Sequence, residues 1–161
     1  MDRQYTRLDA VRAPLDRIIQ SIPDIQTQRA AYVHLYGTGL MAALIAMKRG
    51  YGRETAELAE IAGMLHDLLK YVDPAKDTDD HAHTCAGYAR TEILDRLDCF
   101  SEEEKQLICD GIYCHSDKHV KGTPFEEIIK DADAAHHALR NPMENYFYFK
   151  DRMQQIMSEL I

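Results

Sequence analysis

Apolar residues recur along this chain at the three- and four-residue spacing of amphipathic helices, and the strict alternation of a half-buried strand is almost absent. Leu, Ala, Met, Glu, Gln, Lys and Arg dominate the periodic segments, and these residues have high helix propensities. We therefore predict an all-α fold, a single compact bundle of about seven helices.

Capping residues, prolines and glycines set the predicted helix boundaries. Ser101, Thr123 and Asn141 are each followed three positions later by Glu, which is the pattern of a capping box. Proline disfavours helical geometry in the residue before it, so helices should end before Pro23 and near Pro74. The predicted helices cover residues 3–20, 24–48, 54–71, 81–97, 102–115, 124–140 and 142–160.

Length and charge narrow the class of protein. The 161 residues make one domain, long enough to bury a core without disulfides. The net charge of −8 argues against a nucleic-acid or membrane partner and favours a small molecule. The four cysteines show no C-x-x-C spacing and the N-terminus does not resemble a signal peptide, so we expect a cytoplasmic protein. The longest weakly polar stretch, Gly37 to Met47, is too short to span a bilayer.

The stretch GMLHDLLKY, which begins at Gly63, places His66 and Asp67 in an otherwise apolar run. The dipeptide alone carries little information, because about one is expected by chance at this composition. On a helix, Ala59, Ala62 and Gly63 lie one turn before His66, and this small face predicts close packing. A buried carboxylate is costly unless it is paired or binds a metal, so Asp67 needs a cation.

Three further histidines, His34, His83 and His115, have small or apolar surroundings on other predicted helices. Each alone is more often a hydrogen-bonded core residue than a ligand. Together they favour a metal site, because imidazole and carboxylate are the usual ligands of divalent first-row metals and facing helices can present them. A cluster of His34, His66, Asp67 and a distal acid would satisfy every one of these groups.

Other candidate residues have ordinary explanations. His81 follows Asp80 at a predicted helix start, which indicates a cap or a surface position. His136 and His137 are individually uninformative. Lys70 is accounted for as a cation near a helix C-terminus.

The order of these residues resembles the HD-domain superfamily of metal-dependent phosphohydrolases over about residues 30 to 140. The matching pieces are the isolated early histidine, HDLLK in the H-D-x-x-K form and HTCAG in the H-x-x-x-G form. A histidine that ends a helix in IYCHS and a late DAD complete the series.

The resemblance implies an all-helical fold with a set of six metal ligands: His34, His66, Asp67, His83, His115 and Asp133. Asp133 is preferred to Asp131 because family members present this ligand as the Asp of an Ala-Asp pair. His83 and His115 match the additional histidines of members that bind two metals, with Asp67 as the bridge. The implied cofactor is one or two divalent ions, with Fe or Mn favoured over Zn, Co, Ni and Mg.

The resemblance also implies hydrolysis of a phosphate ester or anhydride of a small molecule, a nucleotide or related metabolite, by a metal-activated water. Asp67 would orient that water and Lys70 would neutralise phosphate charge. Lys118 and His119 are weaker candidates for substrate contact, because a solvated surface patch is the simpler account. The segments HDLLK and DADAAHHALRNP lack the motifs of the cyclic-dinucleotide phosphodiesterases and the dinucleoside-tetraphosphate hydrolases, so the subfamily stays open.

Two other functions fit the same ligands. One is a di-iron oxygenase of the superfamily, and the other is a non-catalytic, metal-containing ligand-binding or sensory module. The C-terminal helix either packs on the core, which we expect, or forms the seam of a homodimer. Its apolar and aromatic residues include Tyr146, Phe147, Tyr148, Phe149 and Met153.

Overall fold

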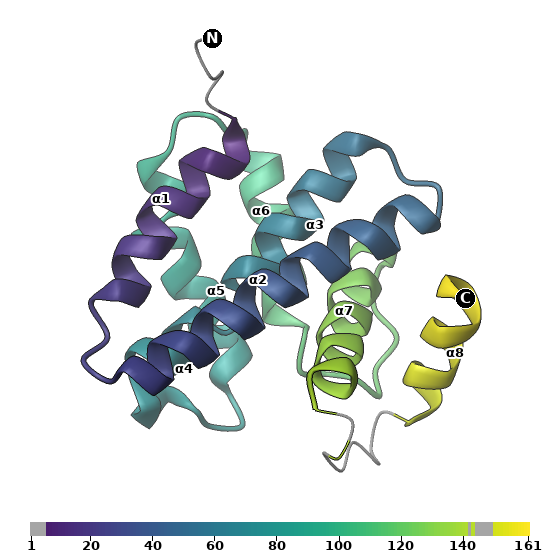
Figure 1. Ribbon diagram of the computed structural model, residues 1–161. Coiled ribbons are helices and arrows are strands. Elements are labelled where there is room, and N and C mark those ends of the chain that lie inside the picture. The colour runs from purple at the N-terminus through teal and green to yellow at the C-terminus, as the bar shows by residue number, and fades with distance from the viewer. Residues whose placement is uncertain (1–5, 142, 144–149) are drawn as a thin grey trace, which may run out of the picture.

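The computed structural model describes residues 6–141, 143 and 150–161. Within these residues the chain forms eight α-helices and two short 3-10 helices and no strand, which confirms the all-α prediction (Figure 1). In chain order the elements are α1 (Arg7–Gln20), α2 (Ile25–Lys48), α3 (Arg53–Leu65), α4 (Leu68–Val72), η1 (Pro74–Lys76), α5 (His81–Glu92), η2 (Leu94–Arg96), α6 (Glu102–Tyr113), α7 (Pro124–Arg140) and α8 (Lys150–Leu160).

Side chains cap two helices where the sequence predicts capping boxes. At the start of α6, Ser101 accepts a hydrogen bond from the backbone N–H of Glu104, whose side chain accepts one from the backbone of Ser101. Thr123 and Glu126 form the same pair at the start of α7. The third predicted box, which begins at Asn141, extends outside the described residues.

The helix α2 occupies the centre of the bundle. It crosses the front of the molecule in Figure 1, with α3 and α7 packed against it. At the crossing with α3, a Cβ added to Gly63 would lie 2.8 Å from Gly39 Cα, closer than real side chains approach. The close packing predicted around Gly63 is confirmed, and it brings His34 of α2 close to His66.

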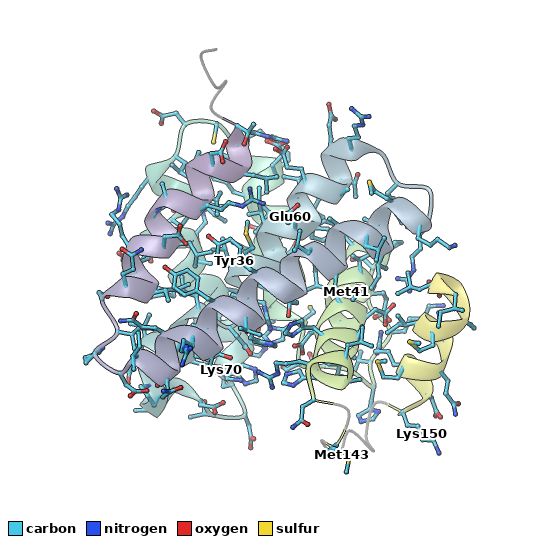
Figure 2. All side chains as sticks on the ribbon, viewed as in Figure 1. Tyr36, Met41, Glu60, Lys70, Met143 and Lys150 are labelled. Carbon is cyan, nitrogen blue, oxygen red and sulfur yellow. The ribbon has the colours of Figure 1, made fainter. Side chains whose placement is uncertain are left out.

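The first and last helices pack on this centre. Tyr36 of α2 lies between α1 and α2 (Figure 2), and its hydroxyl donates to Asp16 Oδ1 at 2.6 Å. On α8, Met153 is buried in the core, as expected for a helix that packs on it. The aromatic run before α8, from Tyr146 to Phe149, lies outside the described residues.

The helix predicted over residues 54–71 is interrupted at the His-Asp pair. α3 ends at Leu65 and α4 begins at Leu68, and Asp67 between them has a non-helical backbone, with φ −119° and ψ 11°. On an unbroken helix, neighbouring side chains project about 100° apart. Because the helix is interrupted, His66 Nε2 and Asp67 Oδ2 instead face each other at 3.4 Å inside the bundle.

Two more helices are shorter than predicted. The helix predicted over residues 81–97 ends at Glu92, and the single turn of η2 follows it. The helix predicted over residues 102–115 ends at Tyr113, so His115 lies in the turn after α6. There, the imidazole Nδ1 of His115 contacts the carbonyl oxygen of Ile112 at 2.6 Å, which fixes the ring against the end of the helix.

By length and composition alone, α2 is apolar enough to cross a membrane. The helix is longer than the stretch from Gly37 to Met47 considered above. However, 44% of its most apolar window is buried inside the protein, where Leu35 and Ile45 are part of the core. Core packing therefore explains part of its apolar character, and its exposed face is considered below.

The variant Gly63→Ala tests the helix crossing. The added methyl group would collide with the backbone of α2, so we expect the free energy of unfolding to fall by about 3 kcal/mol. Gly87→Ala is the matched control, because nothing lies within 4 Å of a Cβ at Gly87 in α5. This control should be neutral or stabilise by up to about 1 kcal/mol. Equal stability of the two variants in urea unfolding would show that the crossing is looser than described.

Candidate metal centre

Five buried side chains from four parts of the chain meet inside the bundle. They come from α2, from the turn between α3 and α4, from the turn after α6 and from α7. Each is at most 5% exposed. The five residues are His34, His66, Asp67, His115 and Asp133. Neutral imidazoles and carboxylates are rarely buried together unless they bind one another or a cation. The atoms that face each other decide between these possibilities.

The ligand atoms form two groups that share His66. In the first, the Nε2 atoms of His34 and His66 lie 3.1 Å apart, and they lie 3.5 and 3.4 Å from Asp133 Oδ1. In the second, Asp67 Oδ1 lies 3.2 Å from His115 Nε2. The other oxygen, Asp67 Oδ2, lies 3.4 Å from the Nε2 atoms of both His34 and His66. Asp67 thus turns one oxygen toward each group.

Backbone carbonyls fix which imidazole nitrogens face this point. His66 Nδ1 lies 2.7 Å from the carbonyl oxygen of Gly63, and His115 Nδ1 lies 2.6 Å from that of Ile112. A carbonyl oxygen only accepts, so each Nδ1 carries a proton and each Nε2 is the nitrogen that faces the cluster. Imidazole Nε2 atoms and carboxylate oxygens therefore converge on one point, which is the arrangement that a bound cation stabilises.

The state of the two carboxylates also favours a bound cation. Asp67 Oδ1 and Asp133 Oδ1 are buried, and no group in the described part of the chain donates a hydrogen bond to either. Burial raises the pKa of Asp67, but the imidazoles of His66 and His115 outweigh it and hold that pKa well below its usual range. Burial also raises the pKa of Asp133, and Lys118 and His66 reverse this effect. Both carboxylates are therefore ionised, as metal ligands must be.

Comparison with protein families identifies the domain that carries this cluster. The family model described as HD domain matches residues 31–138, which is 108 of the 161 residues and includes every member of the cluster. The chain belongs to the HD domain family. Members of this superfamily are generally metal-dependent hydrolases, in agreement with the donor atoms gathered here. No curated protein and no solved structure matches the chain.

The structure corrects one residue of the predicted HD-domain ligand set. The side chain of His83 is 40% exposed and stacks on Tyr113, so it does not reach the cluster. His81 does, with its Nε2 3.2 Å from His115 Nε2 and 3.5 Å from Asp67 Oδ1. Residues two positions apart point to nearly opposite sides of a helix, so only one histidine of the HAH segment can face inward. The H-x-x-x-G spacing that His83 forms with Gly87 favoured the wrong histidine.

Asp131 and Asp133 lie two positions apart on α7, as His81 and His83 do on α5. Asp133 lies in the cluster of the HD domain. Asp131 lies between two arginines, with Oδ2 2.5 Å from Arg49 Nη2 and Oδ1 2.5 Å from Arg152 Nη1. Because Arg49 follows α2 and Arg152 belongs to α8, Asp131 joins three helices and takes no part in the cluster.

Two histidines of α7 that the sequence left unassigned lie against the cluster. His136 Nδ1 is 3.2 Å from His34 Nδ1, the ring nitrogen of His34 that points away from the other ligands. The ring of His136 fills the space beside Gly37, where a Cβ would lie 2.1 Å from His136 Nε2. His137 Nε2 lies 3.4 Å from Asp133 Oδ1. Their spacing of three and four residues from Asp133 was the available signal, because it places all three on one face of α7.

Two lysines bring positive charge to the edge of the cluster. Lys70 Nζ lies 3.1 Å from Asp67 Oδ2, and Lys118 Nζ donates to Asp133 Oδ2 at 2.6 Å. Lys118 is therefore not part of a solvated patch, contrary to the simpler interpretation of the sequence. His119 is exposed and lines a separate pocket of about 390 Å³, so the structure does not bring it to the cluster.

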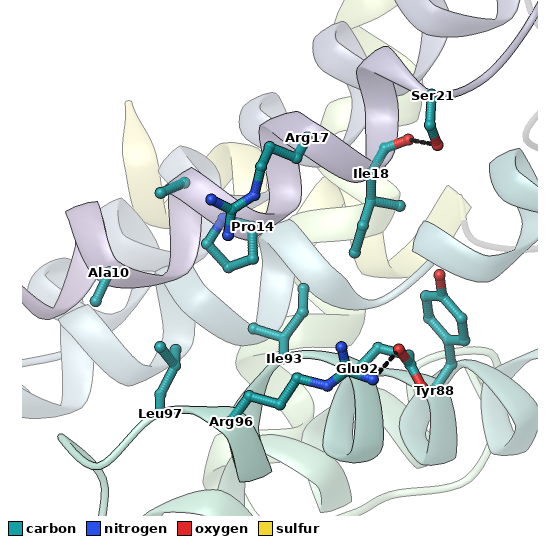
Figure 3. Close-up of a pocket in the computed structure, with 11 residues that line it drawn as sticks. Ala10, Pro14, Arg17, Ile18, Ser21, Tyr88, Glu92, Ile93, Arg96 and Leu97 are labelled. Carbon is teal, nitrogen blue, oxygen red and sulfur yellow. Dashed lines mark hydrogen bonds and ion pairs between the residues drawn. The ribbon is translucent and has the colours of Figure 1, made fainter.

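A second pocket, of about 520 Å³, lies between α1 and the segment formed by the end of α5 and η2 (Figure 3). Pro14, Ile18 and Ile93 supply apolar walls, and Arg96 pairs with Glu92 at its edge. The pocket shares no residue with the histidine and aspartate cluster. It is therefore not part of the candidate metal centre.

Asp131 and Asp133 provide a matched pair of variants. Asp133→Asn removes a ligand charge, and we expect metal affinity to fall at least about 100-fold. Asp131→Asn leaves Arg49 and Arg152 without a shared counter-charge, so the free energy of unfolding should fall by about 3 kcal/mol while bound metal is unchanged. Elemental analysis and urea unfolding measure both effects. Equal metal loss in the two variants would contradict these assignments.

His81 and His83 form a second pair. His81→Ala should lower the metal-to-protein ratio, because its Nε2 lies in the group around His115. His83→Ala should leave the ratio at the wild-type value, since its ring stacks on Tyr113 away from the cluster. The ratio is measured after dialysis against a weak chelator. The opposite ranking of the two variants would restore His83 as the ligand.

Proposed function

We propose that this HD domain is a phosphohydrolase that cleaves a phosphate ester or anhydride of a small molecule, such as a nucleotide, with two adjacent divalent ions. One observation carries the proposal. Asp67 turns its two oxygens toward two histidine groups, and the ammonium group of Lys70 lies at the edge of the same carboxylate. The histidine groups on either side of Asp67 would each hold a cation, and Lys70 would supply positive charge for a phosphate.

The donors divide naturally between two ions. His34, His66 and Asp133 would hold one, while His81 and His115 would hold the other, with Asp67 between them. When bound, divalent ions of this kind lower the pKa of a coordinated water to about 7 and polarise a phosphoryl oxygen. The carboxylate of Asp67 would orient such a water.

Other residues of the chain prepare this site. The carbonyls of Gly63 and Ile112 hold two imidazoles so that Nε2 faces the cluster. Lys118 occupies Asp133 Oδ2, so that Oδ1 faces the histidines. The side chain of Lys70 is 23% exposed, and its ammonium group lies between Asp67 Oδ2, at 3.1 Å, and Asp77 Oδ1, at 3.3 Å. A phosphate bound beside Asp67 would lie next to this charge.

The donor atoms of the two groups are nitrogen and oxygen only, which supports Fe or Mn as the metal. Burial raises the pKa of the Cys85 thiol to about 11, so this cysteine stays protonated and does not act as a thiolate ligand. Zn, Co and Ni accept the same donors, and their supply in the cell decides among them, whereas Mg is disfavoured because it prefers oxygen ligands.

The variants Asp67→Ala and Lys70→Gln test the proposal. Asp67→Ala should abolish both metal binding and phosphate release from a panel of nucleotides and sugar phosphates, while circular dichroism shows the helices retained. Lys70→Gln should keep its metal and lower kcat/KM about 100-fold, because one charge that stabilises the transferred phosphate is lost. Lys76→Gln is the control, since Lys76 is exposed on η1 and should not change turnover.

The same assay separates the other functions considered. Wild-type turnover in the Asp67→Ala variant would refute the metal-dependent mechanism. Oxygen consumption by iron-loaded protein without phosphate release would identify an oxygenase. Metal-dependent melting with neither activity would identify a ligand-binding or sensory module.

A further inference from the structure

Between Val33 and Met47, the outward face of α2 carries four large apolar side chains that the core does not cover. Val33, Leu40, Leu44 and Met47 are 54%, 61%, 46% and 55% exposed. Their spacing places all four within about 60° of one another around the helix. We name these four residues the α2 stripe. Figure 1 shows no other helix in front of α2 on this side of the molecule.

The α2 stripe lies in a part of the helix without charged side chains. From Ala30 to Met47 there is no Asp, Glu, Lys or Arg, although the chain as a whole carries a net charge of −8. His34 is the one imidazole in this range, and it is buried in the metal centre. Scattered apolar residues are normal on a surface, but a continuous uncharged stripe on one helix indicates an interface.

Three residues of the stripe are evenly spaced along the helix. Val33 lies seven positions before Leu40 and Met47 lies seven positions after it, so these three residues present the same pattern when the helix is turned end for end. Leu44 has no such counterpart, because the equivalent position is Tyr36, which bonds to α1. If two copies pair antiparallel about Leu40, Val33 of one copy lies opposite Met47 of the other. A two-fold interface brings the same surface patch of each copy together.

We propose that the α2 stripe is the interface of a homodimer, in which two α2 helices pack antiparallel across a two-fold axis at Leu40. This inference is independent of the proposed hydrolase activity. In an acidic protein, two copies repel wherever acidic faces meet, and the α2 stripe is a face without acidic residues. A membrane surface fits less well, because the net charge of −8 opposes binding to anionic lipid.

The size of the stripe predicts a weak dimer. From Val33 to Met47 it is about 21 Å long. One helix on each side buries less than the roughly 800 Å² per partner of a standard interface. We therefore expect a dissociation constant in the micromolar range, roughly 10 to 100 μM, and a monomer–dimer equilibrium that depends on concentration.

Sedimentation across this concentration range tests the interface. Wild-type protein should shift from monomer to dimer, and Leu40→Glu should raise the dissociation constant at least about 100-fold, because it places two like charges at the axis. Val120→Glu is the control, since Val120 is a 62% exposed apolar residue outside α2, and this variant should dimerise like wild type. A wild-type protein that stays monomeric throughout, or a control that weakens as much as Leu40→Glu, would overturn the proposal.

Cysteine crosslinking tests the register. With the exposed Cys99 replaced by Ser, Leu40→Cys should form a disulfide-linked dimer under mild oxidation, because Leu40 meets its own copy only at the axis. Ile25→Cys lies on the same helix at 59% exposure and should not crosslink, because the antiparallel pairing separates the two Ile25 positions. Crosslinking of both variants would indicate parallel pairing. Binding to phosphatidylglycerol vesicles without dimer formation would assign the stripe to a membrane. Either result refutes the antiparallel dimer.

Discussion

Two ionised carboxylates, those of Asp67 and Asp133, lie inside the bundle with oxygens that receive no hydrogen bond from the described residues. A buried charge without a counter-charge costs several kcal/mol, which is a large fraction of the stability of an ordinary domain. Lys70 and Lys118 neutralise one oxygen of each carboxylate. The remaining oxygens face imidazole nitrogens, and a cation bound between them would complete the centre of the fold.

The packing of the surrounding helices positions the residues of this centre. The glycine contact between α2 and α3 brings the backbones together where His34 and His66 must meet. Beside it, Gly37 leaves room for His136, whose ring contacts the outer nitrogen of His34. A second imidazole thus supports a ligand at a position where carboxylates or carbonyls are more usual. On the far side of α7, Asp131 and its two arginines tie α8 to the same helix that carries Asp133.

Local sequence signals predicted much of this architecture. The pairs Ser101 with Glu104 and Thr123 with Glu126 act within one turn, so their geometry follows from the sequence alone. The convergence of His34, His66, Asp67, His115 and Asp133 was accessible through the family pattern. The choice between His81 and His83 could not be made from the sequence, because it depends on which side of α5 faces the bundle. Lys118 was missed for a similar reason: a loop lysine looks solvated until tertiary structure places a carboxylate 2.6 Å away.

The break between α3 and α4 has a consequence for protein design. Adjacent residues of a continuous helix cannot both approach one small ion, so the letters His-Asp do not carry the site by themselves. A designed bundle that copied them into an uninterrupted helix would present one donor and turn the other away. The unit to transplant is the short turn from Gly63 to Lys70, including the carbonyl that holds His66 and the loss of helical geometry at Asp67.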